Sequence, residues 1–352
     1  MNLASLAQGR NNNFNLIRLI AAFAVLFSHS FSLATGLWDS EPLRNSLGIT
    51  PGMIAVDIFF IASGFLVTGS LISRNNVIGF AVARILRIYP ALIIMVLITG
   101  IFGAFYTSLS PSSYYNASIF WTYILKNISL VTGLTNNLPG VFTQNPIKNA
   151  VNGSLWTLIY EIKMYILLAI IWTTLKPLPI NKIRAFSLIV ALFALCARIM
   201  HFFGHYNTNV INNELARLSF MFFCGSVFYM AKDHIKLSHS IFAILITALT
   251  LSSTNKELFF ITYQFTISYL LFYIAYIPKG VILKYNKIGD YSYGIYIYAF
   301  PIQQALLASQ PGISIEGLFL SSSAITLIFA ILSWHFIECK AMKLKFRPSS
   351  KQ

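Results

Sequence analysis

Long runs of apolar residues alternate with short polar segments along almost the whole chain. An apolar run of about 20 residues is long enough for an α-helix to cross the hydrocarbon core of a membrane. Ten runs meet this criterion, and they lie at approximately 14–34, 53–73, 89–109, 153–174, 185–203, 214–231, 238–254, 257–277, 291–309 and 316–338. The pattern therefore predicts an all-α fold, a polytopic membrane bundle of about ten transmembrane helices in a single domain over residues 1–352.

The basic residues are distributed unevenly over the polar segments. If the N-terminus faces the cytoplasm, most of the 25 Lys and Arg residues fall in cytoplasmic segments and few fall outside. The positive-inside rule expects this bias, which predicts that both termini are cytoplasmic. A further span within 115–134 would scramble the bias. That segment contains Lys126 and Asn127, and it predicts an interfacial or partly buried helix.

The composition narrows the class of protein. The chain of 352 residues is 57% hydrophobic and only 10% charged, whereas soluble domains carry about 25% charged residues. We interpret the net charge of +15 as a topology signal and expect no nucleic-acid partner. The three cysteines, Cys196, Cys224 and Cys339, have neither metal-ligand spacing nor a disulfide framework, so no metal site is expected.

Two ionisable residues, Arg18 and His29, lie within the first apolar run. Eleven residues complete three helical turns plus about 20°, so both side chains share one helix face about 16 Å apart. An ionisable residue inside a membrane span is costly, and a functional role is the default hypothesis. The structural alternatives are a backbone hydrogen bond for His29 and an arginine that reaches the inner headgroups for Arg18.

Two carboxylates are expected at a depth similar to that of His29. By the helical rise, His29 lies about 22 Å from the cytoplasmic side, Glu161 about 12 Å below the outer face and Asp57 about 6 Å below it. A carboxylate beside an imidazole orients it and raises its basicity, as general base catalysis requires. The structural alternatives are a polar pair with Lys163 for Glu161 and a helix-start charge for Asp57.

Arg84 and Arg87 are three residues apart and share one helix face at the predicted inner boundary. Arginine binds phosphate through two parallel hydrogen bonds, so a phosphorylated donor is one candidate ligand here. The alternative is that these arginines set the topology and contact lipid headgroups.

Five motifs stand in a fixed order along the chain. They are Arg18-x10-His29, Gly52-Met-Ile-Ala-Val-Asp57-Ile-Phe-Phe-Ile-Ala-Ser63-Gly64-Phe65-Leu, Arg84-x-x-Arg87-x-x-Pro90, Gly153-Ser154-Leu-Trp156-Thr-Leu-Ile-Tyr160-Glu161 and Tyr291-Ser292-Tyr293-Gly294-Ile-Tyr296. Together they resemble the acyltransferase 3 family of integral membrane acyltransferases, which typically acetylate bacterial surface carbohydrates. Many members have a histidine shortly after the last motif, and this chain has none in 297–301, so any role of that histidine is not carried over.

The resemblance implies a reaction that crosses the membrane. The family is thought to take acyl groups from acyl-CoA in the cytoplasm and to pass them to acceptors on the other side. On this basis Arg84 and Arg87 bind the CoA phosphates, and Arg18 lines the route or holds the donor. His29 is either the general base for the acceptor hydroxyl or a transient carrier of the acyl group.

The resemblance also implies an acceptor site. Glu161 and Asp57 are expected to orient His29 or to contact the acceptor. Trp156 and Tyr160 fit a platform for a sugar ring as well as they fit an interfacial aromatic belt. Acetyl is the expected acyl group, and the acceptor is expected to be a polysaccharide or a lipid-linked repeat unit.

The remaining implications concern location and partners. The expected location is the bacterial cytoplasmic (inner) membrane, with polysaccharide-biosynthesis proteins as possible partners. No tightly bound cofactor is expected, because acyl-CoA is a substrate. Some members append an extracytoplasmic esterase-like domain, and none is expected here because the chain ends soon after the last span, with basic residues in 340–351. The alternative function is a transporter or flippase of a lipid-linked sugar or small molecule.

Overall fold

The computed structural model describes residues 1–9, 11–204 and 212–344, and within these ranges the chain is helical and forms no strand. Of the predicted basic segment 340–351, the positions from 345 onward lie outside the described residues. Seven helices of the described chain are long and apolar enough to span a membrane. They are α2 (Phe14–Thr35), α4 (Pro51–Arg74), α5 (Val77–Gly103), α8 (Trp156–Leu175), α9 (Ile180–Phe202), α12 (Lys256–Tyr276) and the continuous rod Ile315–Lys343. The predicted all-α polytopic bundle is confirmed.

The other three predicted spans are also helices, namely α10 (Asn213–Met230), α11 (His239–Ser252) and α13 (Ser292–Ser309). The central helix α13 packs against α2, α5 and α14. It buries polar side chains such as Gln303 and Gln304, whose amide groups donate to backbone carbonyls of neighbouring segments. Because protein rather than lipid surrounds it, α13 tolerates a polarity that a lipid-facing helix does not.

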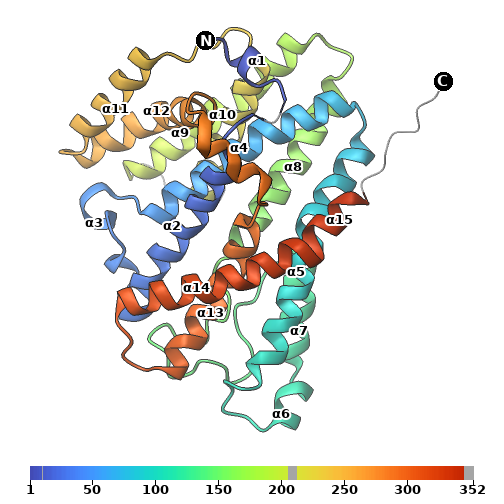
Figure 1. Ribbon diagram of the computed structural model, residues 1–352, viewed down its shortest axis with the longest axis vertical. Helices are drawn as coiled ribbons and strands as arrows, with labels where there is room; N and C mark the ends of the chain where they lie inside the picture. The colour runs from blue at the N-terminus through green and yellow to red at the C-terminus, as the bar shows by residue number, and fades with distance from the viewer. Residues whose placement is uncertain (10, 205–211, 345–352) are drawn as a thin grey trace.

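The rod Ile315–Lys343 consists of three parts, which are α14 (Ile315–Ser333), a π-helical segment (Trp334–Glu338) and α15 (Cys339–Lys343). It crosses the bundle obliquely, whereas α5 and α8 run closer to the long axis of the molecule (Figure 1). The short α1 lies at one end and α6 at the other (Figure 1). The remaining elements are short and lie between the long helices: α1 (Leu3–Leu6), η1 (Trp38–Ser40), α3 (Arg44–Leu47), α6 (Pro111–Asn116), α7 (Ser118–Ser129) and η2 (Gly280–Lys287).

One predicted boundary is wrong by a wide margin. The third span was expected at 89–109, whereas α5 runs from Val77 to Gly103. The Asn76 side chain accepts a hydrogen bond from the Gly79 amide at 3.1 Å and starts the helix there. Arg84 and Arg87 lower the hydropathy at the start of α5, and the predicted span therefore began too late. Both arginines lie on the same helix as the apolar run. The other nine predicted spans begin within five residues of an observed helix start.

The segment 115–134 is mostly helical, as predicted. It contains the last residues of α6 and all of α7, which packs against α5. Tyr123 and Asn127 of α7 are fully buried, whereas Trp121 is more than half exposed. The prediction of a partly buried helix is therefore confirmed.

Helices α4 and α10 approach each other very closely at two glycines. A Cβ atom added to Gly64 would lie 1.9 Å from the carbonyl oxygen of Phe222, and one added to Gly225 would lie 2.0 Å from that of Ile61. Only glycine fits at either position, and small residues of this kind let membrane helices pack backbone against backbone. This contact fixes α4, which carries residues of both pockets described next.

Candidate functional site

The bundle contains two cavities whose walls carry most of the predicted site residues. The larger cavity, of about 340 Å³, is called here the arginine pocket, because Arg18, Arg84 and Arg87 all line it. The smaller one, of about 150 Å³, is called the histidine pocket, because His29 lines it. The structure therefore brings the three predicted donor-binding arginines together and places His29 in a separate cavity.

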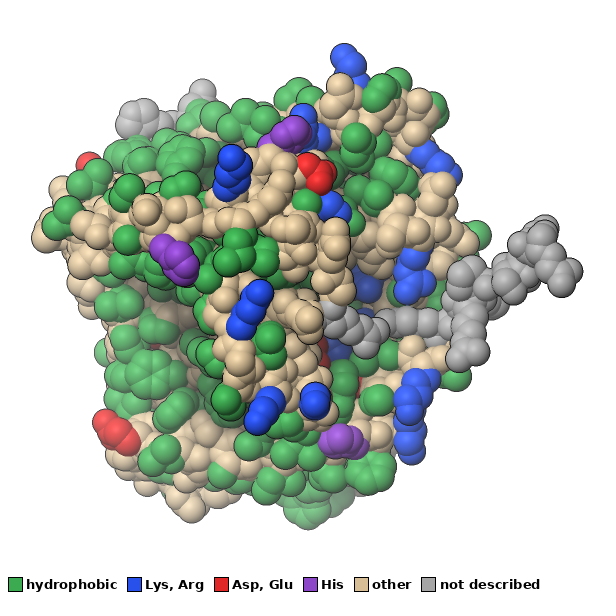
Figure 2. Space-filling view, turned by 45° about the horizontal axis from the view of Figure 1, so that its top comes forward, with side chains coloured by type: hydrophobic (Ala, Val, Ile, Leu, Met, Phe, Trp, Pro, Cys, Tyr) green, Lys and Arg blue, Asp and Glu red, His purple; other side chains and the backbone are tan. Residues whose placement is uncertain are grey.

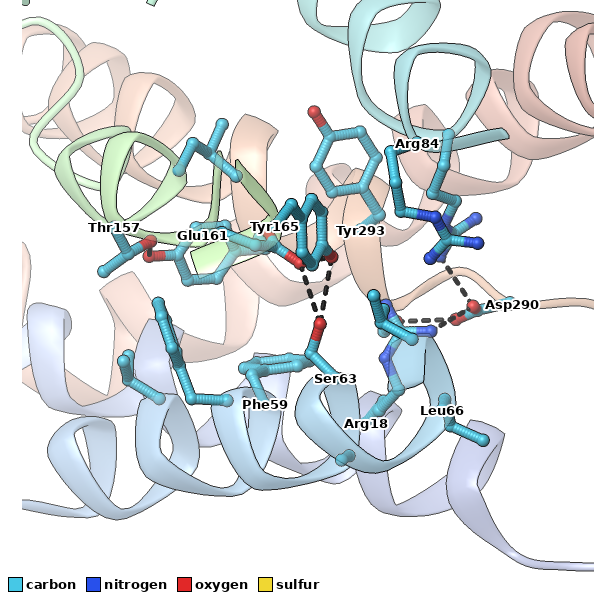
Figure 3. A pocket seen from close by; sticks show the side chains of 18 of the residues that line it. Arg18, Phe59, Ser63, Leu66, Arg84, Thr157, Glu161, Tyr165, Asp290 and Tyr293 are labelled. Atoms are coloured by element: carbon cyan, nitrogen blue, oxygen red, sulfur yellow. Dashed lines mark hydrogen bonds and ion pairs between the residues drawn. The ribbon is translucent and has the colours of Figure 1, made fainter. Parts of the chain in front are cut away.

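Asp290 occupies the centre of the arginine cluster. Its Oδ2 atom accepts from Arg18 Nη1 and from Arg87 Nη2, each at 2.6 Å, while its Oδ1 atom accepts from the Ser292 hydroxyl at 2.6 Å. Figure 3 shows Asp290 and Arg18 at one end of the cavity, with dashed lines running from Asp290. Two guanidinium groups thus share a single carboxylate oxygen.

The charge state of Asp290 follows from these neighbours. Asp290 lies in the connection between η2 and α13. Burial by itself raises the pKa of a carboxyl, but the guanidinium groups of Arg18 and Arg87 outweigh it and lower the pKa of Asp290 to about 2. The carboxylate is therefore ionised at neutral pH and holds both arginines in place.

Arg87 and Arg84 differ in the remaining contacts that their guanidinium groups make. Arg87 Nη1 also donates to Glu338 Oε2 at 3.2 Å, from the π-helical segment. The Nε atom of Arg84 is buried and has no hydrogen-bond partner within the described part of the chain. The guanidinium carbon of Arg84 lies 5.9 Å from the ring centre of Tyr165. Arg84 thus makes no hydrogen bond to the described residues, whereas Arg18 and Arg87 are both bound to Asp290.

A second polar group lies further along the arginine pocket. The Ser63 hydroxyl is 2.9 Å from the Tyr165 hydroxyl and 3.4 Å from Glu161 Oε1, and the Tyr165 hydroxyl donates to the same Glu161 oxygen (Figure 3). Glu161 and Tyr165 stand one turn apart on α8, so they share a face of that helix. Glu161, predicted as a partner of His29, therefore lines the arginine pocket and bonds to α4 instead.

The imidazole of His29 has no fixed partner. Its Nδ1 atom is buried and makes no hydrogen bond to any described residue. Its ring packs edge-to-face against Phe300, with the ring centres 5.4 Å apart. The neighbouring Ser28 hydroxyl accepts from the Gly52 amide at 2.7 Å and ties α2 to the start of α4. The backbone around His29 is fixed, while its ring nitrogens remain available to a ligand.

The histidine pocket also contains a carboxylate that the sequence pattern did not single out. Glu41 follows η1, is 7% exposed, and has its Oε1 atom 3.4 Å from Arg44 Nη2. Burial raises the pKa of Glu41, and Arg44 offsets this only in part. No periodicity marks a loop residue, so only its acidic character within a short polar loop could have pointed to it.

Asp57 lines neither pocket, but it bonds to Arg217, a residue of the histidine-pocket wall. Its Oδ1 atom accepts from Arg217 Nε at 2.8 Å and its Oδ2 atom from the Tyr263 hydroxyl at 2.9 Å. Arg217 also donates to the Met53 carbonyl at 2.6 Å and to Glu214 at 3.0 Å. Asp57 and Arg217 are 1% and 2% exposed, so the carboxylate is enclosed and reaches the histidine pocket only through Arg217, which lines it.

The aromatic residues predicted for the acceptor site lie near His29. Trp156 lines the histidine pocket together with Trp38. Tyr160 packs against Trp156, with ring centres 5.7 Å apart. No group of three or more His, Cys, Asp or Glu side chains suited to a metal ion occurs among the described residues.

The two pockets adjoin. Val56 of α4 and Tyr296 of α13 line both of them. The Tyr296 hydroxyl donates to the Ser154 carbonyl at 2.9 Å and is 2.5 Å from the Thr157 hydroxyl. The arginine pocket and the histidine pocket therefore lie next to each other, and the side chains of Val56 and Tyr296 separate them.

Comparison with known proteins gives three informative relatives. A family described as "Acyltransferase domain" matches residues 11–335. A protein named "O-acetyl transferase", from Shigella phage Sf6, is 29% identical over 350 residues, which cover 94% of this chain and 95% of the relative. "Nodulation protein 10" from Rhizobium leguminosarum bv. viciae is 28% identical, and the match covers 96% of this chain and 95% of that relative. "O-acetyltransferase OatA" from Staphylococcus aureus is 24% identical, and the match covers 86% of this chain but 55% of that relative. No solved structure matches significantly.

Proposed function

This chain belongs to the acyltransferase family and is a membrane O-acyltransferase, and from that premise we propose that it moves an acetyl group from acyl-CoA to a carbohydrate hydroxyl. The donor binds in the arginine pocket and the acceptor binds in the histidine pocket. The observation that carries this proposal is the pair of adjoining cavities, one cationic and one containing an unpaired imidazole.

The arginine pocket fits an elongated anionic donor. It follows α4 from Val67 to Val56, eleven residues or about 16 Å of helix. Arginines bind phosphate oxygens through charge-assisted hydrogen bonds, and Arg84 has unused donors for them. Arg18 and Arg87 join in when donor phosphates compete with Asp290 for their guanidinium groups. The thioester arm then extends along α4 toward His29.

His29 supplies the base for the transfer. Its ring nitrogen takes the proton of the acceptor hydroxyl while the hydroxyl oxygen attacks the thioester carbonyl. The carbon–oxygen bond forms, the carbon–sulfur bond breaks, and the proton passes from His29 to the departing CoA thiolate. A variant route with the acyl group carried briefly on the imidazole uses the same free nitrogen, and it would leave an acyl-histidine that mass spectrometry detects.

The histidine pocket fits a carbohydrate. Trp38 and Trp156 offer flat apolar faces for sugar rings, and the Glu41 carboxylate accepts hydrogen bonds from sugar hydroxyls. The acceptor class proposed is therefore a surface polysaccharide or a lipid-linked repeat unit.

The orientation proposed has the arginine pocket open to the cytoplasm of a bacterium, with both termini on that side of the inner membrane. Lys and Arg side chains gather on the face shown in Figure 2, where Asp and Glu are few. An excess of basic residues on one side is the usual mark of the cytoplasmic face, which supports this orientation.

The test is transfer of labelled acetyl groups from acetyl-CoA to a carbohydrate acceptor by purified protein in lipid nanodiscs. His29→Ala is expected to lower the transfer rate by about 10²- to 10⁴-fold, the usual contribution of a positioned base. The matched control is His234→Ala, in the exposed turn after α10, which is expected to retain the wild-type rate. Transfer by His29→Ala at the wild-type rate would show that His29 is not catalytic. A flippase or transporter would move its sugar without consuming acetyl-CoA.

A further inference from the structure

The wall between the two pockets is narrow and well fixed. Of the described residues, only Val56 and Tyr296 line both cavities, and each is 8% exposed. Val56 lies seven residues before Ser63, about 10 Å along α4. Thr157, which bonds to Tyr296, lies at the end of the arginine pocket opposite Asp290 (Figure 3). Val56 and Tyr296 are thus the part of the wall that the arginine pocket and the histidine pocket share.

The Tyr296 side of this wall is held by three neighbours. Its hydroxyl bonds to the Ser154 carbonyl at 2.9 Å and to the Thr157 hydroxyl at 2.5 Å. Its ring packs edge-to-face against Phe59, with ring centres 5.9 Å apart. Swinging the ring aside would break both hydrogen bonds of a buried hydroxyl, which costs more than an exposed side chain would lose. The tyrosine is therefore a rigid side of the opening.

The Val56 side is rigid for a different reason. Valine in a helix strongly prefers one side-chain rotamer. Its helix, α4, is locked against α10 through Gly64 and Gly225, so the backbone cannot retreat without a clash. Both residues that the two pockets share are therefore held in place, Val56 by its helix and Tyr296 by its hydrogen bonds.

We propose that Val56 and Tyr296 form an aperture that determines the largest acyl group this enzyme transfers, with Val56 as the residue that sets its width. The inference rests on the proposed function, because it assumes that the acyl group enters from the arginine pocket. The thioester end must reach His29 through the aperture, while the CoA phosphates stay behind with the arginines. The acyl group passes the aperture ahead of the thioester sulfur, so a longer acyl chain brings more methylene groups past the same two side chains.

The size of the effect follows from the chemistry of apolar pockets. One extra methylene group in a tight apolar site typically changes kcat/KM by about 10- to 200-fold. Val56→Ala removes two methyl groups from the opening, and Val56→Leu adds a longer branched chain to it. The two substitutions are therefore expected to shift acyl preference in opposite directions.

The experiment measures kcat/KM for acetyl-CoA and butyryl-CoA with the full chain in nanodiscs. Val56→Ala is expected to raise the butyryl-to-acetyl ratio by about tenfold or more. Val56→Leu is expected to lower acetyl transfer and to lower butyryl transfer by a larger factor. The matched control is Val96→Ala, a fully buried valine of α5 that lines neither pocket, and its butyryl-to-acetyl ratio should equal that of wild type.

The outcomes separate the aperture from the proposed function. If wild-type protein transfers no acyl group from any acyl-CoA, the proposed function fails. If wild type transfers acetyl but Val56→Ala and Val96→Ala give the same ratio as wild type, the aperture is wrong and the function stands. If Val56→Ala does not fold, Val56→Leu decides alone: unchanged acetyl transfer would overturn the aperture. Tyr296→Phe, which keeps the ring and loses both hydrogen bonds, should raise the ratio by a smaller factor than Val56→Ala.

Discussion

Two buried aspartates pair with arginine in this protein, and their surroundings differ. Asp57 uses one oxygen for Arg217 and the other for Tyr263; the carboxylate itself lines neither pocket, and only its partner Arg217 borders the smaller, histidine pocket. Asp290 offers one oxygen to two arginines beside a cavity of about 340 Å³. The same two functional groups thus form an enclosed, closed pair in one place and an open charge cluster beside the larger cavity in the other. The shared oxygen and the larger adjoining volume, rather than residue type, distinguish them.

The largest expected effect is on the closed pair. Asp57→Ala leaves the Arg217 charge buried without its main partner, and removing one member of a buried pair costs about 3–5 kcal/mol of stability. The check is unfolding of the protein in mixed micelles, with the exposed Asp39→Ala as control. Wild-type stability combined with a large loss of transfer would instead assign Asp57 to the acceptor site.

The next effect concerns the arginine with unused donors. Arg84→Ala is expected to weaken CoA binding by about tenfold or more, because a hydrogen bond to a charged group contributes about 1.5–3 kcal/mol. Stability should change little, since Arg84 makes no ion pair with any other described residue. Calorimetric titration with CoA measures this, with the exposed Arg74→Ala on α4 as control. Equal affinity for all three proteins would remove Arg84 from the donor site.

A smaller effect is expected from pH, through Asp290. Its pKa in the folded protein, about 2, lies below the ordinary value of 3.8. The stability it contributes is therefore present above about pH 4 and is lost as the pH falls toward 2, about 2 kcal/mol in total. The stability of wild type over Asp290→Asn should thus shrink between pH 5 and pH 3. A difference that stays constant over this range would mean that the carboxylate is not held by its arginines.

The smallest effect concerns competition in the open pair. Asp290→Asn keeps the size of the side chain and removes its charge, so donor phosphates no longer displace a carboxylate from Arg18 and Arg87. CoA is expected to bind severalfold more tightly, a change of about 1 kcal/mol. Titration calorimetry at two salt concentrations measures the affinity for CoA. The salt dependence of CoA binding is also expected to fall, because fewer charges compete for the arginines. Weaker binding than wild type would show that Asp290 positions the arginines more than it competes for them.

The sequence predicts the helices well because long apolar runs carry that information directly. The third span was wrong because Arg84 and Arg87 interrupt the apolar pattern of α5 without interrupting the helix. Helical rise gives the depth of a residue along its own helix, and this placed Arg18 and His29 at opposite ends of one helix face. Depth does not give the rotation of one helix against another. For this reason Glu161, placed at a depth close to that of His29, lies in a different pocket.

Contacts between residues distant in the sequence could not be predicted, for the same reason. Asp290 lies 272 residues from Arg18, and no pattern within either segment connects them. Buried arginines in a membrane protein need carboxylate partners, so the existence of such partners is predictable from the sequence. Which carboxylates they are depends on how the helices pack.

The π-helical segment Trp334–Glu338 has a consequence for the end of the bundle. A π turn holds one more residue than an α turn, so it offsets the angular register of everything that follows it. In this register Glu338 reaches Arg87 and Met342 lines the arginine pocket. Deleting a single residue there would restore an α turn and rotate α15 by about 100° about its axis. The one extra residue of the π turn thus sets the rotation at which α15 meets the arginine cluster.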